Sequence, residues 1–115
     1  MDIFISDKRL RKVADDDAAR RREYGVNMAK KIALRLASLR AAVSLADFWP
    51  PKSGPERCHE LIGDRKGTFS IDLNQPYRLL FQSRSKPPAE DVTDEQQRWK
   101  SITEIDITAI EDTHG

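Results

Sequence analysis

The chain has 115 residues, of which 38% are hydrophobic and 34% are charged, with a net charge of +1. This length fits one domain with a real core and excludes an enzyme built from a cofactor domain plus a substrate domain. The single cysteine, Cys58, excludes an internal disulfide and a zinc site made of several cysteines, so we expect a small buried hydrophobe there.

The charges are distributed unevenly along the chain. Residues 20 to 86 hold 14 lysines and arginines against 6 acidic residues, whereas residues 87 to 115 hold 2 against 8. A basic body of this kind favours a local surface for a polyanion, and the alternative is a set of solvated helix faces. No apolar run approaches the roughly 20 residues that span a bilayer, and no secretory signal is visible, so we expect a cytoplasmic protein without a membrane partner.

Two helices are predicted after a short apolar start at residues 2 to 5. Ser6 and Asp7 are good N-cap residues, so the first helix should begin there and end near Tyr24, before Gly25. The second helix is indicated by apolar residues at helical spacing, namely Met28, Ile32, Leu36, Leu39 and Val43. Together they predict a helical hairpin.

Regular structure is interrupted at Trp49, Pro50, Pro51, Gly54 and Pro55, and the apolar period then changes to two. Residues 68 to 73 and 77 to 82 predict an antiparallel hairpin with one buried face, closed by Asn74 to Pro76. Gly63 to Gly67 should be a turn after the strand that carries His59. Residues 84 to 98 are polar and predict a mobile loop, and a last strand should run from about Trp99 to Ala109.

The predicted fold class is α+β, with two N-terminal helices packed on a small antiparallel β-sheet in one domain over residues 1 to 115. The segments GDRKGTFSIDL, YRLLF and EDTH, placed after two helices, resemble the RelE/ParE superfamily of bacterial toxins. The HigB branch, also called plasmid maintenance killer proteins, is the most similar. The resemblance covers nearly the whole chain.

This resemblance implies the toxin of a type II toxin-antitoxin system that cuts messenger RNA on the small ribosomal subunit. It also implies a HigA-like helix-turn-helix antitoxin, with operator DNA bound only through that antitoxin, and no cofactor or metal. The reaction would be transesterification: a ribose 2′-hydroxyl loses a proton, the leaving 5′-oxygen gains one, and fixed cations stabilise the added charge on phosphorus.

The resemblance also implies site residues. His59 and His114, the two histidines of the chain, match catalytic positions, with Asp112 as a carboxylate that could orient an imidazole and Arg78 as the arginine of the sheet. Four cations are expected to bind RNA phosphates: Arg57, Arg65, Lys66 and Lys30.

Several alternatives remain open from the sequence. Arg78 could instead pair with Asp72 across the hairpin, and Arg65 and Lys66 could be ordinary turn charges. Ile62 and Thr113 stand where HigB relatives often have lysine and tyrosine. A gyrase-inhibiting toxin similar to ParE, or an inactive module that binds antitoxin and operator, would therefore also suit this scaffold.

Overall fold

The computed structural model describes residues 1–84 and 94–112 as an α+β fold around a five-stranded sheet. The strands follow the order β1-β5-β4-β3-β2, and their bounds are β1 Asp2–Phe4, β2 His59–Glu60, β3 Thr68–Asp72, β4 Tyr77–Ser83 and β5 Glu104–Asp112. The helices are α1 Lys8–Asp15, α2 Asp17–Tyr24, α3 Val26–Ala41 and α4 Glu95–Ser101, with 3₁₀ turns η1 Leu45–Phe48 and η2 Gly63–Arg65.

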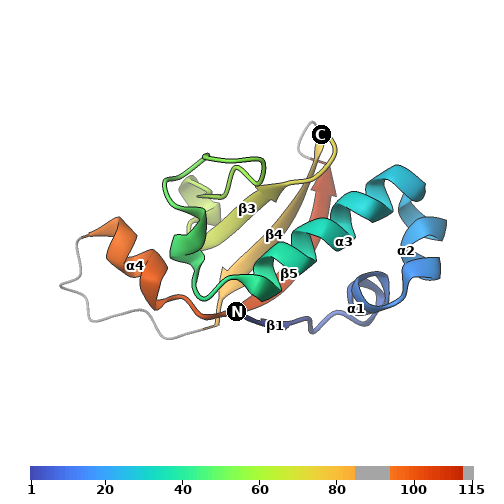
Figure 1. Ribbon diagram of the computed structural model, residues 1–115, viewed down its shortest axis with the longest axis horizontal. Helices are drawn as coiled ribbons and strands as arrows, with labels where there is room; N and C mark the ends of the chain where they lie inside the picture. Colours follow the sequence, from blue (N-terminus) through green and yellow to red (C-terminus); the bar gives the residue numbers. More distant parts are fainter. Residues whose placement is uncertain (85–93, 113–115) are drawn as a thin grey trace.

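The core lies between α3 and one face of the sheet. Figure 1 shows α3 along the sheet, with α1 and α2 toward one end of the molecule and α4 toward the other. Met28, Ile32, Leu36 and Leu39 of α3 are buried in one cluster with apolar residues of β3, β4 and β5, as their helical spacing predicts. Val43 does not belong to this stripe, because the helix has ended and its side chain is 80% exposed.

The prediction of a single first helix was wrong, because the chain forms α1 and α2 with a break at Asp16. The backbone of Asp16 is extended, and its side chain accepts hydrogen bonds from the N–H groups of Ala18 and Ala19. Asp16 therefore caps a new helix rather than continuing the old one. Arg20 satisfies carbonyl groups freed at the end of α1, since it donates to Val13 and Ala14 at 3.1 and 2.8 Å.

The sheet is mixed rather than wholly antiparallel. β1 pairs with β5 in parallel, and the other neighbouring strands are antiparallel. The predicted hairpin is present as β3 and β4, and the turn after His59 contains η2. The expectation of one buried face was wrong for β3, where Thr68, Ser70 and Asp72 are buried as well. β3 is an interior strand, so β2 and β4 cover both of its edges, and on its second face Arg57 and Arg78 lie against Asp72.

The end of the predicted loop and the start of the predicted last strand form α4 instead. Asp94 caps this helix by accepting from the N–H of Gln96 at 2.9 Å. Trp99, expected in a strand, is a helical residue buried against Phe69 and Trp49. The rest of that loop prediction, residues 85 to 93, lies outside the described residues. β5 begins only at Glu104.

Two further expectations concern Cys58 and the membrane. Cys58 is buried, as predicted, and burial raises the pKa of its thiol to about 12. Among the described helices, none combines the length and the apolar character needed to cross a bilayer.

Candidate functional site

A row of charged side chains crosses three strands on the sheet face opposite α3. Asp72 of β3 pairs in register with Arg78 of β4, and Arg78 pairs in register with Glu111 of β5. Residues directly opposite each other on neighbouring antiparallel strands place their side chains on the same face. His59 joins this face, because it pairs with Ser70, two residues before Asp72. We call the surface formed by His59, Asp72, Arg78 and Glu111, with the arginines that reach them, the polar face.

Asp72 holds two arginines at one edge of the polar face. Its carboxylate lies 3.5 Å from Nε of Arg57 and 3.8 Å from Nε of Arg78, and its side chain is only 10% exposed. The pairing of Arg78 with Asp72, which the sequence offered as an alternative, is therefore present. A phosphate role for Arg78 stays a prediction. The role is compatible with the exposure of 30% of its side chain.

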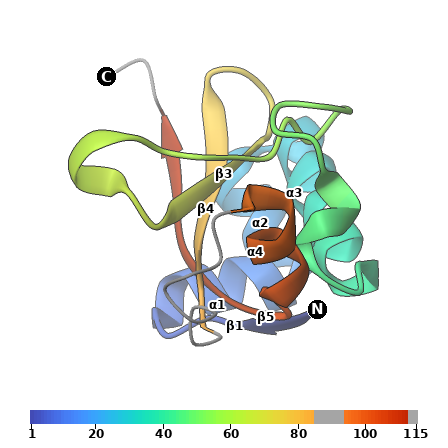
Figure 2. The ribbon, with the colours of Figure 1, turned by 90° about the vertical axis from the view of Figure 1, so that its left-hand side faces the viewer.

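Arg65 reaches the other end of the row from the η2 turn. Its two terminal nitrogens donate to the two carboxylate oxygens of Glu111, each at 2.8 Å. This hydrogen bonding raises the pKa of Arg65 and lowers the pKa of Glu111. Figure 2 shows the η2 turn on the side of the sheet opposite α3, so this ion pair joins the turn to β5 over the polar face.

His59 is oriented by the backbone of the preceding segment. Nδ1 of His59 lies 2.8 Å from the carbonyl oxygen of Arg57. A carbonyl can only accept, so Nδ1 carries a proton and Nε2 of the neutral ring is left as an acceptor. The ring also borders a hollow of about 430 Å³, which is lined by Pro51, Lys52, His59, Glu60, Leu61, Ile62 and Glu95. His59 can therefore accept a proton from a molecule bound beside it.

The remaining predicted site residues are placed differently. Lys66 is exposed at the end of η2, close in sequence to Arg65. Lys30 is exposed on α3, in the layer on the other side of the sheet, so it does not join the polar face. Asp112 follows Glu111 on β5 and pairs with Tyr77, so its side chain points to the opposite face. His114 lies outside the described residues.

Arg35 supports the site although the sequence analysis did not select it. It is buried on α3, and it donates to the carbonyl oxygen of Asp72 at 2.8 Å and to that of Pro55 at 3.1 Å. The N–H of Asp72 in turn donates to the carbonyl of Glu56 at 2.8 Å. These bonds fix the segment that carries Arg57 beside β3. The burial of Arg35 could have been predicted from helical spacing, because Arg35 lies three residues after buried Ile32.

Replacing Arg35 by methionine should lower the free energy of unfolding by about 2–4 kcal/mol, because two backbone carbonyls lose a charged donor. Urea denaturation followed by circular dichroism would measure this loss. Arg40→Met is the matched control, because Arg40 is exposed on the same helix and its loss should change stability by about 0.5 kcal/mol or less. Equal effects of the two substitutions would show that the bonds of Arg35 do not stabilise this region.

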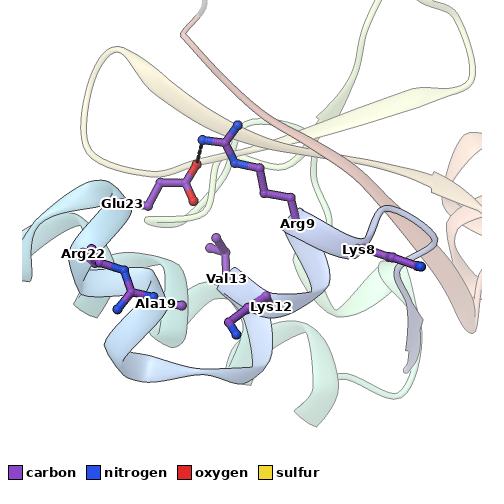
Figure 3. Close-up of a pocket in the computed structure, with 7 residues that line it drawn as sticks. All are labelled: Lys8, Arg9, Lys12, Val13, Ala19, Arg22 and Glu23. Carbon is purple, nitrogen blue, oxygen red and sulfur yellow. Dashed lines mark ion pairs between the residues drawn. The ribbon is translucent and has the colours of Figure 1, made fainter.

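A second cationic surface lies between α1 and α2 (Figure 3). This groove of about 520 Å³ is lined by Lys8, Arg9, Lys12, Val13, Ala19, Arg22 and Glu23. Arg9 pairs with Glu23 at 2.6 Å, and the other three cations add positive charge around an apolar floor. The groove belongs to the helical layer and is separate from the polar face. In residues 1–84 and 94–112, no group of three or more His, Cys, Asp or Glu side chains is arranged to hold a metal ion.

Comparisons with known proteins are informative for solved structures. No protein-family model matches the chain, and no curated protein matches it in sequence. Among solved structures, the chain is similar to a YoeB/ParE toxin from Agrobacterium tumefaciens, with a TM-score of 0.54 and 14% identity. The match covers 97% of this chain and 98% of that one. The chain therefore has the fold of a YoeB/ParE toxin, which agrees with the superfamily fold expected from the sequence.

Proposed function

We propose that this chain is the toxin of a bacterial type II toxin-antitoxin pair and an endoribonuclease that cuts messenger RNA on the ribosome. The observation that carries the proposal is the polar face, where an imidazole with a free acceptor nitrogen shares one sheet surface with three arginines. The YoeB/ParE toxin fold supports the toxin assignment. A HigA-like antitoxin, which would neutralise the toxin and contact operator DNA, is part of the same proposal.

The proposed reaction needs no group beyond the side chains of the chain and the RNA. Nε2 of His59 accepts the proton of the ribose 2′-hydroxyl as its oxygen attacks the adjacent phosphorus. The bond from phosphorus to the 5′-oxygen breaks, and that oxygen takes up a proton, for which the sequence offers His114 as donor. The products are a 2′,3′-cyclic phosphate and a 5′-hydroxyl end.

The arginines of the polar face stabilise the charge that develops on phosphorus. Arg78 lies in the middle of the row, between Asp72 and Glu111, and Arg57 and Arg65 approach from the segments beside β3. A guanidinium group can donate two parallel hydrogen bonds to phosphate oxygens, which fixes the phosphate as well as stabilising it. Lys66, at the end of the η2 turn, can add a further phosphate contact.

Induced expression in a bacterial host tests this proposal. We expect growth arrest together with new 5′-hydroxyl ends inside translated coding regions, and both effects should be lost in Arg78→Gln. Growth arrest with relaxed plasmid DNA and intact messenger RNA would instead identify a gyrase inhibitor similar to ParE. Neither effect, with retained binding to an antitoxin, would identify an inactive binding module. Of these two alternatives, the inactive module has a specific observation in its favour, because carboxylates pair with the three arginines in the free protein.

A further inference from the structure

The carboxylates that hold the arginines of the polar face differ in how firmly they are fixed. Asp72 is 10% exposed, and its backbone is held by Arg35 and Glu56. Glu111 is 36% exposed and lies one residue before the end of β5. The side chain of Asp72 is therefore fixed in the sheet. The side chain of Glu111 can rotate away from Arg65 without disturbing buried groups.

The contact between Arg65 and Glu111 has the geometry with which arginine binds phosphate. Two parallel N–H···O bonds of 2.8 Å join the guanidinium group to two oxygens of one anion. A phosphodiester also offers two non-bridging oxygens and a single negative charge, so it fits the same fork. Ion pairs between exposed side chains contribute little to stability, and the Arg65 side chain is 44% exposed. Arg65 can therefore exchange one anion for another at low cost.

We propose that Glu111 occupies the position of an RNA backbone phosphate in the free protein, and that RNA binding replaces the carboxylate by a phosphate on Arg65. This inference rests on the proposed function, because it assigns the polar face to RNA. Glu111 is then a determinant of affinity: it reduces the attraction of the polar face for polyanions in general. RNA binds through Arg65 only where its other contacts compensate for the displaced carboxylate.

Binding of a fluorescein-labelled single-stranded RNA with 2′-O-methyl riboses tests this exchange, because such RNA binds but cannot be cleaved. Glu111→Gln leaves Arg65 without its carboxylate at nearly unchanged volume. We expect the variant to bind about tenfold more tightly in fluorescence anisotropy. The slope of log affinity against log salt should stay nearly unchanged, because the phosphate contact with Arg65 forms in both proteins.

Asp106→Asn is the matched control, because it removes one negative charge from the same strand. Asp106 pairs with Gln82 and lies 3.9 Å from Arg84, away from Arg65. The Asp106→Asn substitution should raise the affinity for RNA by about twofold or less, because it only removes one negative charge. Arg65→Gln in the Glu111→Gln background should remove the tenfold gain.

Three outcomes would overturn the inference: equal gains for Glu111→Gln and Asp106→Asn, a gain that persists without Arg65, or no binding of this RNA by any variant. The result is separable from the nuclease proposal, because the probe is not cleaved. A selective gain in a protein that cuts no RNA would keep the role of Glu111 and end the nuclease proposal. Cutting of messenger RNA without a selective gain in RNA affinity would keep the nuclease proposal and end the proposed role of Glu111.

Discussion

Replacing His59 by glutamine should lower the rate of RNA cleavage by about 10²- to 10⁴-fold, the usual contribution of a positioned general base. Glutamine keeps a polar side chain of similar reach but cannot accept the proton that Nε2 of histidine takes up. The hydrogen bond from Nδ1 to the carbonyl oxygen of Arg57 leaves Nε2 on the side of the ring that points away from the backbone. The initial rate of cutting on a translated message, followed by primer extension, measures the effect.

Two comparisons make the His59 result specific. The thermal unfolding of His59→Gln should match that of the unchanged protein, because the histidine lies at the edge of the sheet and is only partly buried. His114→Gln tests whether the second histidine shares the proton transfers, as the sequence predicts. If His59→Gln keeps more than about a third of the cleavage rate while remaining folded, His59 is not the base.

Replacing Trp99 by alanine should lower the free energy of unfolding by about 3–5 kcal/mol, because it empties a large buried site. The Trp99 ring packs edge-to-face on Phe69 of β3 at 5.7 Å and on Trp49 at 5.1 Å, measured between ring centroids. These contacts attach α4 and the segment after η1 to the core. Guanidinium denaturation followed by circular dichroism would measure the loss.

Trp99→Phe should cost far less, about 1.5 kcal/mol, because a smaller aromatic ring keeps much of the packing. In the part of the chain that the structure describes, Nε1 of Trp99 has no hydrogen-bond partner, so phenylalanine removes no bond. Lys100→Ala, the exposed neighbour, should change stability by about 0.5 kcal/mol or less. A Trp99→Ala protein as stable as Lys100→Ala would mean that α4 does not pack on the core.

The parts of the fold that depend on local pattern could be predicted from the sequence. The apolar stripe of α3 and the alternation on both sides of Asn74 to Pro76 define a helix and a hairpin without reference to the rest of the chain. The break at Asp16 was missed because an N-cap residue inside a helical pattern is easily taken for part of a charged helix face. α4 was missed because one short helix in a polar segment buries only Trp99.

The parts that depend on distant contacts could not be predicted. The parallel pairing of β1 with β5 joins residues near the two ends of the described chain, and no local pattern encodes it. In the site, strand register alone brings His59 and Arg78 to one face of the sheet, and both were expected site residues from the sequence. The contact of Arg65 with Glu111 spans 46 residues and requires the η2 turn to fold over the sheet, so Glu111 was not selected. Lys30 was selected for its charge, which does not reveal the layer in which it lies.

The most direct test of the proposed activity is cutting of one message in a purified translation system, with and without its start codon. The account predicts cuts with 5′-hydroxyl ends inside the translated message, none in the untranslated copy, and about 10²- to 10⁴-fold slower cutting of the translated message by His59→Gln. Equal cutting of both copies would contradict ribosome dependence. An intact translated message in the presence of folded, unchanged protein would contradict the nuclease itself.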